Sequence, residues 1–124
     1  MATTHHIRIR VHNVAEPGEV PDWRFIAKPA VLHVDSTIEG HKVQWHNEHG
    51  GKAKLWFKDA DKVFHNTDIA HSVDIAAAGH LLDVTDSPTV GTYDYQVYCH
   101  ATAPDGTVIR GFAQGNSDPR IMVD

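Results

Sequence analysis

The sequence contains one cysteine and no long apolar run, and each absence excludes a class of protein. Cys99 stands alone among the 124 residues, so no disulfide within the chain can hold the fold together. No segment approaches the roughly 20 apolar residues of a membrane-spanning helix. Residues 1–10 (MATTHHIRIR) also lack the apolar core of a secretory signal. We therefore expect a soluble cytoplasmic protein without a membrane partner, or a periplasmic or secreted one if a leader has been removed.

Clustered positive charge is also scarce. The chain has 11 Lys and Arg against 16 Asp and Glu, which gives a formal net charge of −5. The basic residues are scattered, and Arg8 with Arg10 is the nearest approach to a patch in the sequence. Because a nucleic-acid surface normally needs clustered Lys and Arg, the sequence predicts no nucleic-acid partner.

Histidine, in contrast, is abundant. The 11 histidines equal Lys and Arg combined, so the formal charge would change sign if all of them titrated normally as the pH falls through roughly 6.5. Two interpretations are open at this stage. The histidines occupy solvent-facing strand positions, which is the interpretation we favour, or some of them bind a metal or sense pH.

Alternation of polar and apolar residues is the dominant pattern, and a period of two indicates half-buried β-strands. In residues 5–13, Ile7, Ile9 and Val11 share one face. In residues 91–100, Tyr93 and every second residue to Cys99 share another. The remaining predicted strands are residues 23–26, 30–35, 41–47, 53–57, 73–75, 82–84, 107–112 and 120–123, some of them marginal.

Seven to nine such strands, turn signals roughly every ten residues and no helical period predict an all-β protein. The expected architecture is a Greek-key β-sandwich, and the length fits a single domain over residues 1–124.

Two segments are similar to a known family. Residues 40–48 (GHKVQWHNE) and 76–99 (AAAGHLLDVTDSPTVGTYDYQVYC) resemble, in the same order, segments of the cupredoxins of the plastocyanin and azurin type. The resemblance implies a cupredoxin-like β-sandwich. It also implies a place for a blue-copper site, which needs two imidazoles, one thiolate and a weak axial ligand such as Met.

The resemblance supplies only part of that ligand set. It places the first copper histidine at Lys52 and the copper cysteine at Cys99. It then expects a His and often a Met shortly after the cysteine, whereas His100 follows Cys99 directly and the only late methionine is Met122. The implied copper site is therefore degenerate or incomplete.

His100 is a poor substitute for a missing ligand. Neighbouring residues on a strand point to opposite faces, so Cys99 and His100 can share a metal only if the strand ends between them. The same geometry excludes a Cys–His catalytic dyad. We expect Cys99 to be a small buried apolar residue.

Histidines near turns offer weaker metal sites. His46 and His49 flank a turn together with Glu48 and could converge on a metal as a weak surface chelate. His65 and His71 form a second, weaker pair of the same kind. Polar turn residues also need no metal to explain them.

Catalytic motifs are missing. The sequence has no Gly-x-Ser-x-Gly, P-loop, dinucleotide-binding or His-Glu-x-x-His pattern, and the cupin pattern fails at Glu48. We expect no enzyme activity.

Two residues are candidates for binding. Trp56 alternates outward against Leu55 and Phe57, and an exposed Trp is a typical binding anchor. Lys52 occupies the loop position where the resemblance places the first ligand.

Two functional hypotheses follow. The first is a non-catalytic, cupredoxin-like interaction module without a cofactor, which binds a protein partner or a second copy of itself as a homodimer. The alternative is a copper or other transition-metal protein, with a role in binding or electron transfer. It would use an unconventional set drawn from Cys99, His100, His49 and His46.

Overall fold

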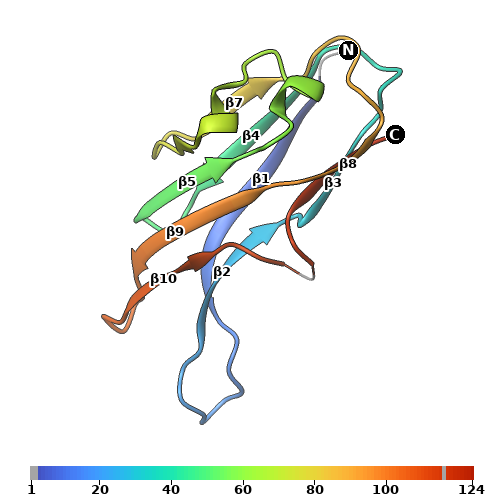
Figure 1. Cartoon of the computed structure of the whole chain (residues 1–124). Helices are drawn as coiled ribbons and strands as arrows, with labels where there is room; N and C mark the ends of the chain where they lie inside the picture. The colour runs from blue at the N-terminus through green and yellow to red at the C-terminus, as the bar shows by residue number, and fades with distance from the viewer. Residues whose placement is uncertain (1–2, 116) are drawn as a thin grey trace.

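The structure is a computed structural model that describes residues 3–115 and 117–124, and it is all-β (Figure 1). Its strands are β1 (Thr3–Asn13), β2 (Trp23–Lys28), β3 (Val31–Val34), β4 (His41–Asn47), β5 (Lys52–Trp56), β6 (Val73–Asp74), β7 (His80–Asp83), β8 (Gly91–Asp94), β9 (Gln96–Thr102), β10 (Val108–Phe112) and β11 (Arg120–Val123). Two short 3₁₀ helices, η1 (Ala60–Lys62) and η2 (Asp68–His71), lie between β5 and β6. In this described part of the chain, no helix is long and apolar enough to span a membrane.

The strands form three sheets. The first has the order β2-β1-β4-β7, the second β10-β9-β5-β6 and the third β3-β11-β8. The β1–β4 and β3–β11 pairs are parallel, and the other pairs are antiparallel. In Figure 1, β5 and β9 lie in front of β1 and β4, while β3, β8 and β11 lie at the end where the chain terminates.

One predicted strand is divided. Alternation indicates a single strand over residues 91–100, but Tyr95 separates β8 from β9, and its backbone N–H donates to the carbonyl of Pro119, next to β11, at 3.1 Å. The pairing partner changes at this point: β8 pairs with β11 in the third sheet, and β9 pairs with β5 and β10 in the second. This division adds one strand, and the described chain has eleven strands where seven to nine were predicted.

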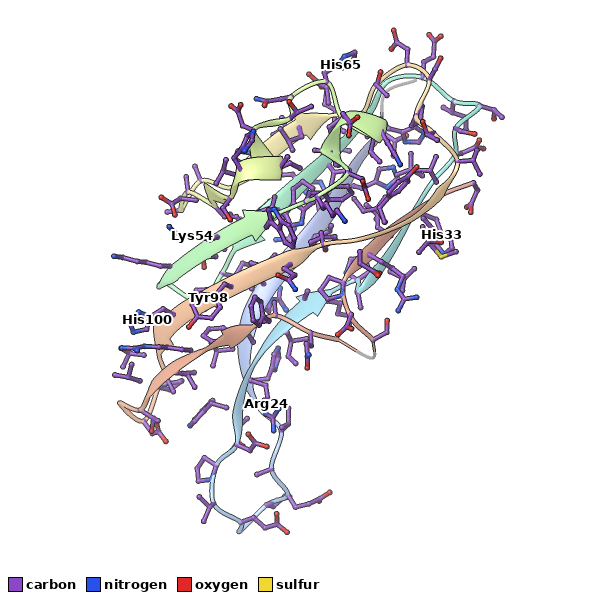
Figure 2. The ribbon with its side chains drawn as sticks, viewed as in Figure 1. Arg24, His33, Lys54, His65, Tyr98 and His100 are labelled. Atoms are coloured by element: carbon purple, nitrogen blue, oxygen red, sulfur yellow. The ribbon has the colours of Figure 1, made fainter. Side chains whose placement is uncertain are left out.

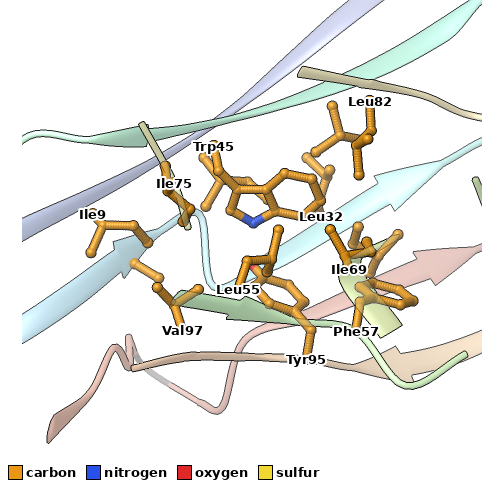
Figure 3. Close-up of a cluster of buried hydrophobic side chains, with 14 of the residues drawn as sticks. Ile9, Leu32, Trp45, Leu55, Phe57, Ile69, Ile75, Leu82, Tyr95 and Val97 are labelled. Atoms are coloured by element: carbon orange, nitrogen blue, oxygen red, sulfur yellow. The ribbon is translucent and has the colours of Figure 1, made fainter. Parts of the chain in front are cut away.

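The inward-facing side chains of all three sheets form one apolar core, which makes the fold a sandwich (Figure 3). Trp45 from β4 meets Tyr95 edge to face, with ring centroids 5.7 Å apart, and Tyr95 stacks on Phe57 at 5.9 Å. Val43 and Leu55 are also fully buried, as alternation predicts. Burial of each large side chain contributes about 1.5–3 kcal/mol, and each aromatic contact about 0.5–1.5 kcal/mol more.

The histidines divide between the surface and the interior. Six of the eleven are exposed, and these are His6, His12, His33, His65, His71 and His100. Solvent-facing positions therefore account for about half of the histidine excess. The others are partly or fully buried, namely His5, His41, His46, His49 and His80.

Candidate functional site

The outer face of the second sheet gathers aromatic and basic side chains. Successive side chains of a strand point to opposite faces, so β5, β9 and β10 each present every second residue to solvent. Figure 2 shows three of these residues, Lys54, Tyr98 and His100, on β5 and β9. We call this surface the basic aromatic face. It comprises Lys52, Lys54, Trp56, Tyr98, His100, Arg110 and Phe112.

Strand register places these residues in rows across the sheet. Tyr98 lies opposite Phe112 on β10 and opposite Lys54 on β5. In the next row, His100 lies between Arg110 and Lys52. Directly opposite residues have their Cβ atoms about 4.5–5.5 Å apart, so each row is a continuous strip of side chains.

The aromatic rings of the face are exposed but held in place. Phe112 is 51% exposed, Tyr98 43% and Trp56 38%. The rings of Tyr98 and Phe112 meet edge to face with centroids 5.1 Å apart. The Trp56 indole N–H donates to the carbonyl of Ala70 at 3.1 Å. Rings that are already positioned lose little conformational freedom when a partner covers them.

The face has an excess of positive charge. Lys52, Lys54 and Arg110 form no ion pair with any other residue in the described ranges. Asp74, opposite Lys54 on β6, is the only acidic side chain on the outer face of the described strands of this sheet. A chain with a net charge of −5 therefore carries a locally positive surface here.

A hollow of about 450 Å³ lies at one end of the face. It is bordered by the turn between β4 and β5 and by β9, and three predicted site residues line it: His49, Lys52 and His100. Gly51 allows the turn to approach β9, because a Cβ atom there would collide with the carbonyl oxygen of His100 and lie 2.7 Å from the Cβ of Ala101. The turn that carries His49 is thus closely packed against β9.

A hydrogen bond and burial determine the tautomer and the charge state of the His49 ring. Its Nδ1 accepts a hydrogen bond from the backbone N–H of Gly51 at 3.1 Å. The proton of the neutral ring therefore lies on Nε2, which is buried and has no hydrogen-bond partner among the described residues. Burial lowers the pKa of His49, so the neutral ring is favoured. Phe25 contacts this ring edge to face at 5.1 Å.

Cys99 lies on the opposite side of the same strand. It is fully buried, between Ala53 on β5 and Gly111 on β10, while His100 is exposed on the outer face. Burial raises the pKa of the Cys99 thiol to about 12. Since the thiolate is the form that binds metals and attacks electrophiles, the buried thiol is poorly prepared for either role.

The predicted turn cluster around His46 separates into different contacts. His46 Nε2 lies 2.8 Å from Nδ1 of His6 on β1. Glu48 forms ion pairs with Arg8 at 3.5 Å and Arg10 at 3.0 Å. In residues 3–115 and 117–124, no group of three or more His, Cys, Asp or Glu side chains is arranged to hold a metal ion.

Sequence reasoning missed two members of the face, both on β10. Alternation alone indicated that Tyr98 and His100 point away from Cys99, and it placed Trp56 outward. It did not indicate that Phe112 and Arg110 on β10 lie beside Tyr98 and His100. The only available signal was the period of two within β10, because strand register is a long-range property.

Comparison with known proteins gives no family: none of the known protein families matches the chain, and no curated protein matches it significantly.

Proposed function

We propose that the protein is a non-catalytic binding module that docks an acidic protein partner on its basic aromatic face. One observation carries the proposal: three exposed aromatic rings lie among three cations without ion-pair partners, on a chain whose net charge is −5. Lys52 and Arg110 lie in one row on either side of His100, so two cations are close together on this surface without a carboxylate between them.

The residue types suit a protein interface. Tyr, Trp and Arg are enriched among the residues that dominate binding energy, and each such anchor contributes about 2 kcal/mol or more. Trp56, Tyr98 and Arg110 supply all three types on one sheet face. Acidic side chains on the partner would pair with Lys52 and Lys54, which adds orientation and a faster association rate.

An acidic protein fits this face better than a nucleic acid. A polyanion approaching the chain meets a net charge of −5, and nucleic-acid affinity depends on neutralising many phosphates at once. The face offers only three cations, Lys52, Lys54 and Arg110. A protein partner needs just a few carboxylates and an apolar contact for the rings.

The scaffold proposal retains the resemblance noted in the sequence. We propose a cupredoxin-like sandwich in which the copper position is not used. The surroundings of Cys99 support this proposal. Cys99 faces Ala53 and Gly111, which offer no ligand atom from their side chains, and Lys52 points to the other face of β5. The alternative of a metal site at Cys99 would require the buried thiol to lose its proton. No constellation of a nucleophile with a base and its orienting group supports catalysis on this face.

Binding to a defined acidic probe tests the proposal. The probe is a short fluorescent peptide of alternating glutamate and tyrosine. Its binding is measured by fluorescence anisotropy at low and moderate salt. A matched peptide with lysine in place of glutamate tests the sign of the charge. A single-stranded oligothymidine tests nucleic acid, and sedimentation of the free protein tests self-association.

Charge reversal locates the site. Lys54→Glu and Tyr98→Ala are expected to weaken peptide binding by about tenfold or more. Lys42→Glu on β4 is the control, because it changes the net charge equally on the outer face of the first sheet. Equal loss in Lys42→Glu, tighter binding of the oligothymidine, or self-association through Tyr98 would each overturn the proposal.

A further inference from the structure

Two imidazoles face each other on the outer side of the first sheet, away from the basic aromatic face. His6 on β1 and His46 on β4 come from neighbouring parallel strands, and His6 Nδ1 lies 2.8 Å from His46 Nε2. Their ring centroids are 5.0 Å apart, and the rings are tilted by 32°. His6 is exposed and His46 is partly exposed, so an ion in solution can reach the pair.

The two rings lie close enough together to share one metal ion. Metal–imidazole bonds are about 2.0 Å long, so two imidazole ligands of one ion have nitrogens about 2.8–3.3 Å apart. The nitrogens of this pair are 2.8 Å apart. The 5.0 Å between the ring centroids shows that they point at each other, as in a hydrogen bond, so each ring turns when both bind one ion. Nitrogen sites generally prefer Cu(II) to Ni(II) and Zn(II).

Protonation of the pair is compatible with metal binding. In the neutral pair, one ring donates a proton to the other across the 2.8 Å contact. For both facing nitrogens to bind a metal, the donor ring moves that proton to its other nitrogen, so no net proton is released.

The surrounding charges limit the affinity without excluding the ion. Arg8 is opposite His46 in the strand pair and would repel a cation, but Glu48 holds Arg8 in an ion pair. Lys42, further along the face, is close to Asp83 at 3.7 Å. Each of these cations therefore has a carboxylate that offsets its charge.

We infer that His6 and His46 form a bidentate site for a divalent transition-metal ion, with Cu(II) bound more tightly than Ni(II) or Zn(II). The order follows the general preference of nitrogen sites for Cu(II). Two positions in the coordination plane remain for water or an external ligand. This inference is independent of the docking proposal and of Cys99.

A chelated ion tests the site in a chain with many histidines. Cu(II)–oxalate keeps two neighbouring positions of the coordination plane free and adds no nitrogen ligand, so it binds a pair of neighbouring imidazoles more tightly than any single histidine. Titration is followed by electron paramagnetic resonance, in which two coupled nitrogens from imidazole identify the bidentate complex. We expect one equivalent bound in this form at neutral pH.

Variants distinguish the pair from other histidines. His6→Ala and His46→Gln are each expected to weaken binding by about tenfold or more, because loss of one ligand removes the chelate. His71→Ala, at an exposed single histidine, and Cys99→Ser are expected to bind as the parent does. Thermal melting of each apo variant confirms that it is folded.

The same titration can overturn the inference. A spectrum with one coupled nitrogen, or unchanged binding in folded His6→Ala and His46→Gln, would show that isolated histidines bind the ion. Loss of the two-nitrogen complex in His71→Ala or Cys99→Ser would place the site elsewhere. Tighter binding of Zn(II) than Cu(II) would contradict the inferred order of affinities.

Discussion

Tyr98 lies directly opposite Phe112 across the β9–β10 pair, and the two exposed rings meet edge to face with centroids 5.1 Å apart. An exposed cross-strand aromatic pair contributes about 0.2–1 kcal/mol to a sheet. Such a contact is worth little to the fold compared with the buried Trp45 cluster. It leaves a large apolar surface in water, which is the surface that a partner would cover.

The first prediction separates binding from stability. Phe112→Ser and Tyr98→Ser are expected to lower the free energy of unfolding by less than about 1 kcal/mol, because both rings are half exposed. The measurement is urea unfolding followed by Trp fluorescence, alongside peptide binding. A loss above about 2 kcal/mol would mean that the pair mainly supports the fold.

The second prediction concerns pH. The folded protein has lowered pKa values at His5, His46 and His49, in each case first because burial disfavours the charged ring. The unfolded chain, with ordinary values near 6.5, therefore binds more protons below that pH. The stability from these neutral rings is present above about pH 6.5 and is lost as the pH falls through the folded values.

Urea midpoints measured above and below the ordinary histidine pKa test this pH dependence. We expect the urea midpoint to be lower below the ordinary histidine pKa, and to change little with pH just above it. His5→Gln, which removes the contact of His5 with His41 at 2.8 Å, is expected to flatten the dependence. His12→Gln, an exposed histidine of the same strand, is the control and should retain it. An equal midpoint on both sides in the parent would contradict the prediction.

The third prediction concerns Cys99. Because the thiol is buried and its pKa is raised to about 12, reaction with a thiol reagent should be slow in the folded protein and fast in urea. Cys99→Ser is expected to cost roughly 1–3 kcal/mol, since it buries a hydroxyl group in an apolar site. Equal reaction rates in folded and unfolded protein would show that the site is open to solvent.

The fourth prediction concerns Gly51. An added methyl group would collide with the backbone of His100, so Gly51→Ala is expected to cost about 1–3 kcal/mol. The turn would move away from β9 and disturb the hollow lined by His49 and Lys52. Thermal unfolding and amide chemical shifts in β9 measure the two effects. A cost below about 0.5 kcal/mol would mean that the turn is free to shift.

Much of the fold is predictable from local pattern. A period of two places Val43, Trp45 and Leu55 inward and Trp56 outward, because the side-chain direction in a strand depends only on position along that strand. The break at Tyr95 is different. Alternation continues through it, and the break lies where the pairing partner changes from β11 to β5 and β10, which is a long-range property.

The candidate sites depend on distances in space that local pattern does not contain. Lys54 and Arg110 are far apart in the sequence, yet each is opposite a residue of β9. A search for clustered basic residues along the chain therefore misses the positive face. His6 and His46 likewise meet only because β1 and β4 pair in parallel with one particular register.

Strand β11 lies between β3 and β8, and its partner in the parallel pair, β3, precedes it by about 90 residues. During synthesis on the ribosome, β3 and β8 therefore emerge with no central strand to join them. Pairings of such high contact order form slowly, and unpaired strand edges invite association between chains. We expect the rate of refolding to be limited by the pairing of β11 with β3 and β8. Before these pairs form, high protein concentration should favour aggregation.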